Sequence, residues 1–303
     1  MFALVPPAPS TASRPAAQAT SDQDGPSGAR VKSVIDWSQR ELIKAVPELK
    51  KLVPPKNAEE GNELLPVILA RVGAAVKAFF QDFPNTTSVE RIRTDRLNSD
   101  GSVMSHIDQQ FNYLALACSN KNQIGLNEYR TDASGAIAEP GGGLVTKGFA
   151  SMAIHFHPVY QADSIFRYLG RERVDGRDAY VVAFAQRPGV ARVAGQISVP
   201  GRSLVVQVQG IAWIDPDSFQ IIRLHTDLLP RLENIGLKRQ STEIAYGEVQ
   251  FTQLHSALWL PAKVTVTLDW RGDVFRNRHQ YSNFKLFAVE TEQSPKSPRP
   301  QDR

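Results

Sequence analysis

The segment Ser203–Leu228 constrains the fold most, because apolar residues alternate with polar or small ones on both sides of a turn signal. On the first arm the alternating apolar positions are Leu204, Val206, Val208, Ala212 and Ile214. On the second arm Ile222, Leu224 and Leu228 recur with the same even parity. This period of two predicts a β-hairpin with one buried face and one solvated face.

The turn of this hairpin is predicted at Asp215-Pro216-Asp217-Ser218. Proline suits position i+1 of a type I turn, and we expect Ser218 to take the left-handed position that follows. A three-residue loop of this kind keeps the even-numbered faces of both arms on the same side. Repetition of such hairpins would build a sheet with one apolar face.

The composition supports a folded domain and excludes several classes of protein. With 303 residues, 42% of them hydrophobic, the chain can bury a large core. The net charge of +4 is small and the charges are scattered, so nucleic-acid binding is not expected. Cys118 is the sole cysteine, which excludes a disulfide within the chain. No apolar stretch reaches the ~18 residues of a transmembrane helix.

Both ends of the chain differ in composition from the rest. Residues 1–30 are predicted to be a disordered leader or the remnant of an export signal, because Ala17-Gln18-Ala19 suits signal peptidase but no basic region precedes the apolar start. A start codon upstream would supply the missing part, and the protein would then be exported to the periplasm. The alternative is a disordered leader that carries no address. Residues 291–303 are predicted to be a disordered polar tail.

Two helices are predicted before the β-rich part. The first spans Asp36–Leu52, capped by Asp36 or Ser38 and broken or kinked at Pro47. The second, Asn62–Phe83, places a broad apolar stripe opposite charged and polar residues, which is typical of a helix that packs on a sheet.

From Ser88 onward the pattern changes to period two. Sequential hairpins with Asp-Gly or Arg-Gly-Asp turns follow one another, which gives about ten strands in residues 31–290. We therefore predict one α+β, mainly β domain: an antiparallel curved sheet, an open half-barrel wrapped around the amphipathic helix, with an extra N-terminal helix.

Four of the β-rich segments stand out: RYLGRERVDGRDAYVVAF (Arg167–Phe184), GIAWIDPDSFQIIRLHTDL (Gly210–Leu228), LWLPAKVTVTLDW (Leu258–Trp270) and HQYSNFKLFAVET (His279–Thr291). The clearest elements in them are the two glycines of the first segment, Trp-Ile-Asp-Pro in the second and Trp-Leu-Pro in the third. These segments resemble successive strands of the LolA-like superfamily, which holds the periplasmic lipoprotein carriers and outer-membrane lipoprotein-sorting proteins of bacteria. The chain is most similar to an uncharacterised exported branch of that superfamily. The resemblance implies the half-barrel fold, whereas no residue of a carrier's handover site is matched.

The concave face of such a sheet is predicted to be apolar, and the long helix would plug or cover it. Any space between helix and sheet would then take a lipid, an acyl chain, a lipoprotein or an apolar segment of a partner. The candidate cavity residues are Val76, Phe79, Phe80, Val206, Val208, Ile222, Leu224, Val264, Val266 and Leu268. No enzymatic activity and no cofactor are predicted, and the oligomeric state stays open.

Two alternative functions remain. His155 and His157 would lie on one side of a strand, as ligands of a zinc site on a sheet do, so a metal-dependent hydrolase is one alternative. The other is an envelope scaffold that pairs through an open sheet edge. The charged run Glu90–Arg96 is interpreted as a solvated strand face, and Asp215 and Asp217 as turn residues.

Overall fold

The computed structural model describes residues 2–5, 32–118, 124–140, 146–199, 202–229 and 236–287. Its helices are α1 (Gln39–Ala45), α2 (Ala58–Gln81) and the 3₁₀ helices η1 (Pro47–Lys51), η2 (Met152–Phe156) and η3 (Gln161–Asp163). Its strands are β1 (Phe2–Val5), β2 (Thr86–Leu97), β3 (Val103–Ala117), β4 (Leu126–Thr131), β5 (Ser164–Val174), β6 (Arg177–Gln186), β7 (Ala194–Val199), β8 (Arg202–Val206), β9 (Val208–Ile214), β10 (Ile221–Leu228), β11 (Leu237–Val249), β12 (Leu258–Trp270) and β13 (Asp273–Leu286).

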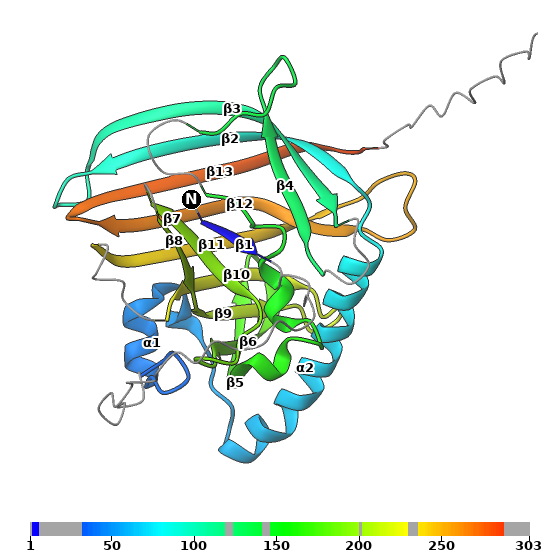
Figure 1. The fold of residues 1–303 in the computed structure, drawn as a ribbon. Coiled ribbons are helices and arrows are strands. Elements are labelled where there is room, and N and C mark those ends of the chain that lie inside the picture. The colour runs from blue at the N-terminus through cyan, green and yellow to red at the C-terminus, as the bar shows by residue number, and fades with distance from the viewer. Residues whose placement is uncertain are drawn as a thin grey trace, which may run out of the picture.

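Ten strands form one sheet in the order β4-β3-β2-β13-β12-β11-β10-β9-β6-β5. Every neighbouring pair in this order is antiparallel. The sheet curves from β3 at the top of Figure 1 to β5 at the bottom, and β4 and β5 are its two edges. The predicted α+β open half-barrel of about ten strands is therefore confirmed.

Local signals explain where the first helices begin and end. Ser38 caps α1 through a capping box with Glu41, and α1 ends just before Pro47, which cannot continue a helix. The predicted single helix is thus two short ones. Helix α2 begins four residues earlier than predicted, at Ala58, because the Asn57 side chain accepts the hydrogen bond of Glu60 N–H and caps it.

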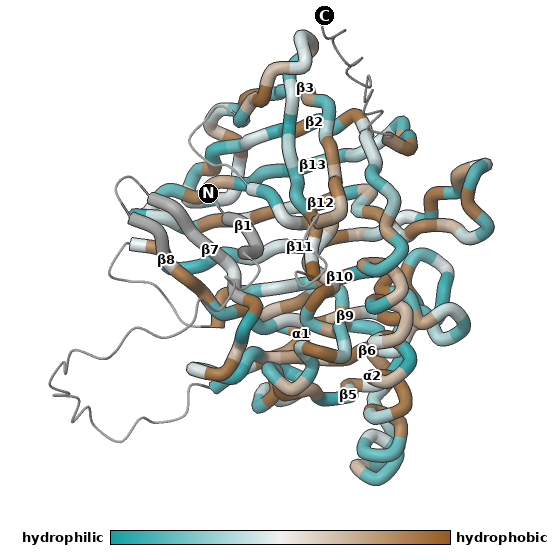
Figure 2. The backbone as a smooth tube through the Cα atoms, turned by 45° about the vertical axis from the view of Figure 1, so that its right-hand side comes forward, coloured by the Kyte–Doolittle hydropathy of each residue, from teal (hydrophilic) through white to brown (hydrophobic). Residues whose placement is uncertain are grey.

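Helix α2 packs on the inner, concave face of the sheet. Its buried residues Ile68, Val72 and Val76 belong to one apolar cluster with the inward side chains of β6, β9, β11 and β12. Figure 2 shows hydrophobic and hydrophilic residues alternating along the long strands, as a sheet with one apolar face requires. The sheet is accordingly curved around the amphipathic helix, as predicted.

A second apolar cluster covers the outer face of the sheet near β5. There Leu42 of α1 and Leu49 of η1 pack with Val181, Ile211 and Trp213, all at most 1% exposed. Strands β6 and β9 are therefore buried on both faces. Gly170 of β5 lets the chain before α2 approach, because a Cβ at this position would lie 2.1 Å from the carbonyl oxygen of Val53.

The hairpin predicted over Ser203–Leu228 is correct in its second part only. Its first arm is divided at Gln207: β8 pairs with β7 in a separate three-stranded sheet, β1-β7-β8, while β9 pairs with β10 in the large sheet. The predicted left-handed residue is also wrong, since Phe219 rather than Ser218 has a positive φ, 55°. The Asp215 carboxylate accepts from the backbone N–H groups of Asp217 and Ser218, and Asp215 N–H closes the turn by donating to the carbonyl oxygen of Gln220.

The predicted turns at Asp175-Gly176 and Arg271-Gly272 are confirmed, because both residues of each pair have positive φ. The predicted leader lies outside the described residues except for Phe2–Val5, which forms β1 and pairs with β7. The predicted tail, residues 291–303, also lies outside the described residues.

Candidate functional site

The inner face of the sheet brings most of the predicted cavity residues together. One cluster contains Val76 of α2 with Val206, Val208, Leu224, Val264, Val266 and Leu268, and none of these side chains is more than 9% exposed. Phe79 and Phe80 pack against the same cluster and are half-buried. The structure thus shows a continuous apolar surface that is covered by α2 and the segment around η2.

Ile222 is the exception among the predicted cavity residues. It belongs to the outer cluster under α1, whereas its neighbour Ile221 lies in the inner cluster. The pairing of β10 with β9 shifts register between Ile221 and Arg223. Such a bulge reverses the side of the sheet on which the next residues lie, so the even parity read from the sequence is wrong at this one position.

The middle and the end of α2 are packed differently. In the middle of the helix Ile68 and Val72 are at most 1% exposed. A Cβ on Gly73 would lie 3.3 Å from the carbonyl oxygen of Phe156, so the helix touches η2 closely here. In the last turns Phe79 contacts Phe80 and Phe83 edge-on, with ring centroids 5.2 and 5.1 Å apart. The aromatic side chains at the end of α2 therefore pack on one another and on the inner cluster, with Phe79 and Phe80 only partly buried.

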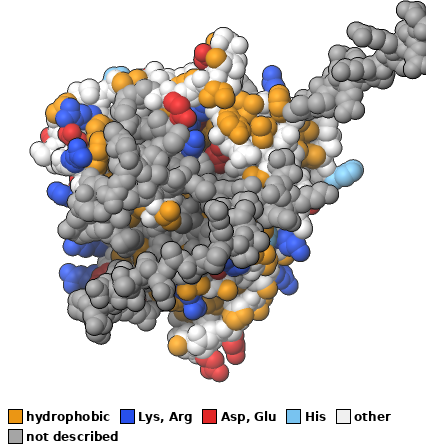
Figure 3. Space-filling view, in the orientation of Figure 1, with side chains coloured by type: hydrophobic (Ala, Val, Ile, Leu, Met, Phe, Trp, Pro, Cys, Tyr) orange, Lys and Arg blue, Asp and Glu red, His pale blue; other side chains and the backbone are white. Residues whose placement is uncertain are grey.

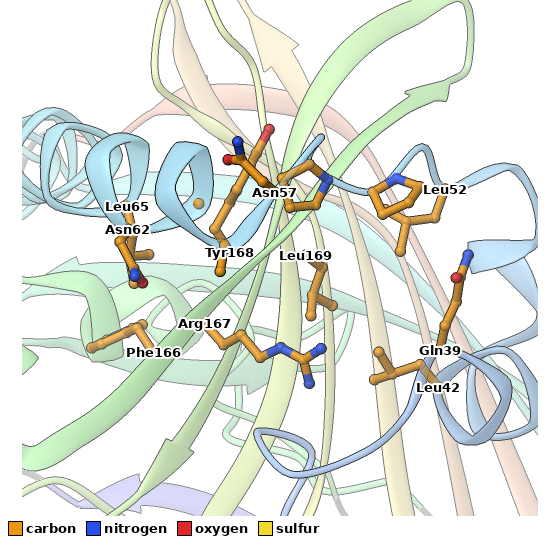
Figure 4. Close-up of a pocket in the computed structure, with 14 residues that line it drawn as sticks. Gln39, Leu42, Leu52, Asn57, Asn62, Leu65, Phe166, Arg167, Tyr168 and Leu169 are labelled. Atoms are coloured by element: carbon orange, nitrogen blue, oxygen red, sulfur yellow. The ribbon is translucent and has the colours of Figure 1, made fainter.

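A pocket of about 460 Å³ opens beside the first turns of α2. Figure 4 shows Leu42 and Leu52 on one side of it, Leu65 and Phe166 on the other, and Leu169 of β5 between them. Its volume lies within the ~300–1,000 Å³ of small-molecule sites in proteins. The pocket is formed where α1, α2 and the edge strand β5 meet.

Polar groups surround the apolar walls of this pocket: Gln39, Asn57, Asn62 and Arg167. Arg167 Nη1 donates to the carbonyl oxygens of Ile35 and Trp37 at 3.0 and 2.8 Å, which ties the chain before α1 to β5. Apolar walls with a few amide and guanidinium groups are the features of a site for an amphipathic molecule.

A buried polar cluster lies on the inner face at the other end of the sheet. Glu90 of β2 is 0% exposed and accepts from Arg130 Nε at 2.5 Å and Arg130 Nη2 at 2.9 Å. Tyr281 Oη at 2.7 Å and His279 Nδ1 at 2.8 Å also bond to Glu90. Burial by itself would raise the pKa of Glu90, but the hydrogen bonds and charges of His279 and Arg130 lower it to about 2.

The same cluster holds the segment before η2 against the sheet. Arg130 Nη2 donates to the carbonyl oxygen of Thr146 at 2.7 Å. The Glu128 carboxylate accepts the backbone N–H groups of Gly148, Phe149 and Ala150 at 2.8 to 3.1 Å. Burial nevertheless raises the pKa of Glu128. Because these groups are buried and bonded to one another, the cluster acts as a clamp that holds part of the inner cover on the sheet.

Sequence analysis missed this clamp because it placed Glu90 on a solvated strand face. It placed Asp95 of the same strand there as well. Both side chains are 0% exposed in the structure. Glu90 shares its parity on β2 with Ser88 and Ile92, and that parity was the one signal that could have placed it on the inner face. Its partner Arg130 is 40 residues away in sequence, so the pairing itself has no local signal.

The predicted placement of His155 and His157 on a strand is wrong. His155 lies in η2 and His157 directly follows it. The His155 ring stacks on Phe184 with centroids 5.4 Å apart, and burial lowers its pKa to about 4. His157 Nδ1 accepts from the backbone N–H of Val159. Within the described residues no three His, Cys, Asp or Glu side chains lie close enough to hold a metal ion.

No protein-family model matches the sequence, and a search of curated proteins finds no match. Solved structures similar to this chain include an outer membrane lipoprotein-sorting protein domain from Vibrio parahaemolyticus, 10% identical over 78% of this chain and 96% of that chain, with a TM-score of 0.40. A DUF1329 family protein from Desulfovibrio piger is 10% identical over 75% of this chain and 95% of that chain, with a TM-score of 0.41.

At these identities and TM-scores the similarity assigns neither a superfamily nor a function to this chain. In the described part of the chain, no helix combines the length and apolar character needed to cross a membrane.

Proposed function

We propose that this protein is an exported, non-enzymatic periplasmic protein that binds a lipid, an acyl chain or an apolar segment of a partner on the inner face of its sheet. The observation that carries the proposal is the continuous apolar inner face, whose cover is made of separate pieces. The middle of α2, its last turns and the segment around η2 each contact this face through different residues. A ligand can therefore replace one piece while the others stay in place.

In this proposal the last turns of α2 move away from the inner face of the sheet when the ligand binds. Phe79 and Phe80 are half-buried, whereas Ile68 and Val72 in the middle of the helix are fully buried. Fewer buried contacts mean a lower free energy of local opening. The pocket beside the first turns of α2 supports the same proposal, because its apolar walls and polar rim would accept part of an amphipathic ligand while the middle of the helix stays in place.

Replacement of Phe80 tests this division of α2. Phe80→Ala is expected to lower the free energy of unfolding by only about 1–2 kcal/mol, because the ring is half-buried, and to change the affinity for a fluorescent acyl probe several-fold. Ile68→Ala is the matched control, with an expected loss of about 2–5 kcal/mol and an unchanged probe affinity. Urea unfolding and fluorescence titration measure both quantities.

The proposal fails if the wild-type protein shows no affinity for acyl probes. The division of α2 fails if both variants lose similar stability and neither alters probe binding, since the whole helix would then be a fixed plug. The scaffold alternative remains a prediction, and its sheet edges are β4 and β5.

A further inference from the structure

The outer face of the sheet carries a group of arginines on two adjacent strands. Arg91 and Arg93 of β2 and Arg276 and Arg278 of β13 alternate with inward residues, so all four lie on the convex side. Arg93 and Arg278 are direct cross-strand partners. Like charges placed directly opposite each other destabilise a sheet unless an anion lies between them.

One buried carboxylate partly neutralises this group. Asp95 is 0% exposed and accepts from Arg93 Nε at 3.0 Å and from Arg278 Nη2 at 2.6 Å, with Arg276 Nε at 3.6 Å. Burial opposes ionisation of Asp95, but its bonds to Arg93 and Arg278 lower its pKa. Asp108 of β3 lies 3.9 Å from Arg93. Four guanidinium groups thus face two carboxylates, and positive charge is in excess.

Arg91 is the guanidinium that these carboxylates do not reach. In the part of the chain that the structure describes, it makes no ion pair and donates Nε–H to Gln110 Oε1 at 3.2 Å. Gln280 is its cross-strand neighbour on β13. Arg91, Arg93 and Arg278, together with Gln110, Gln280 and Asp108, line a groove of about 510 Å³ on this face.

We propose that this outer arginine groove binds a phosphate-bearing group through Arg91, Arg93 and Arg278. Guanidinium groups match the oxygens of a phosphate with paired hydrogen bonds, and the two glutamine amides offer further N–H donors. A bound phosphate would balance the positive charge of the arginines that Asp95 and Asp108 do not neutralise. The group can belong to a lipid headgroup or to a free phosphate compound. The inference goes beyond the proposed function and does not depend on it, since the groove lies on the opposite side of the sheet.

Binding of the full chain to two probes tests the groove. Vesicles of phosphatidylcholine with and without phosphatidylglycerol report headgroup binding by sedimentation, and titration with inorganic phosphate reports the free group. Arg91→Gln is expected to weaken binding about five-fold, as the loss of one arginine at an anionic surface does. Arg40→Gln, on the exposed surface of α1, removes the same charge elsewhere and is expected to leave binding unchanged.

Each outcome of this experiment decides the proposal. Arg91-dependent binding to either probe supports it and identifies the source of the phosphate group. The absence of binding to both probes overturns it, and so does an equal effect of Arg91→Gln and Arg40→Gln, which would indicate attraction by net charge alone. Arg91→Gln is also expected to leave acyl-probe affinity unchanged, so failure of the groove and failure of the inner-face site can be told apart.

Discussion

Replacement of Arg130 by methionine is expected to lower the free energy of unfolding by about 3–5 kcal/mol, because it leaves the carboxylate of Glu90 buried without its cationic partner. The variant also removes the hydrogen bond to the carbonyl oxygen of Thr146, so the segment before η2 loses one of its anchors on the sheet. Urea unfolding followed by fluorescence and circular dichroism measures the loss.

Two further variants distinguish the cost of an unpaired buried charge from the cost of replacing any arginine by methionine. Arg91→Met removes an exposed arginine next to Glu90 in sequence and is expected to cost less than about 0.5 kcal/mol. The double variant Glu90→Gln with Arg130→Met is expected to be more stable than Arg130→Met alone, because it leaves no unpaired charge inside the protein. If Arg130→Met costs no more than Arg91→Met, the clamp does not exist as described.

Phe156→Ala is expected to cost a similar amount, about 3–5 kcal/mol, as for a large aromatic side chain removed from a tight core. Phe156 is 0% exposed, and its ring lies 5.3 Å from that of Phe166 and 5.5 Å from that of Phe184. Its carbonyl oxygen accepts from Gln161 Nε2, which also donates to Leu69 of α2. Phe156 therefore links η2 to strands β5 and β6 and, through Gln161, to the middle of α2.

The matched control lies three residues away in the same segment. Val159 is 48% exposed, so Val159→Ala is expected to change the free energy of unfolding by less than about 0.5 kcal/mol. Thermal unfolding of both variants gives the comparison. Equal losses in the two variants would contradict the placement of Phe156 at the centre of the inner core.

The strands could be predicted from the sequence because alternation and turn chemistry are local properties. Strand β12 has the bounds of the predicted segment Leu258–Trp270, and Arg271 and Gly272 have the positive φ of a tight turn, as the Arg-Gly-Asp signal indicates. Most of the antiparallel pairs follow from these local signals, since strands adjacent in sequence pair with each other, as β9 to β13 do.

What could not be predicted depends on contacts between distant residues. The bulge at Ile221 has no local signal, and it moves Ile222 to the outer face. Glu90 was placed on a solvated strand face because its pairing with Arg130 requires β2 and β4 to flank β3. The pocket beside α2 combines three elements from different parts of the chain. Sequence periodicity describes the faces of each strand, but not how loops and helices cover them.

Native mass spectrometry of the full chain, purified gently and without added lipid, tests the central claim most directly. The proposed function predicts that part of the protein carries additional mass in the range of a lipid or fatty acid, and that denaturation releases this mass and leaves the mass of the chain alone. A single unliganded mass in repeated preparations, together with no affinity for acyl probes, would contradict the claim that the inner face of the sheet is a binding site.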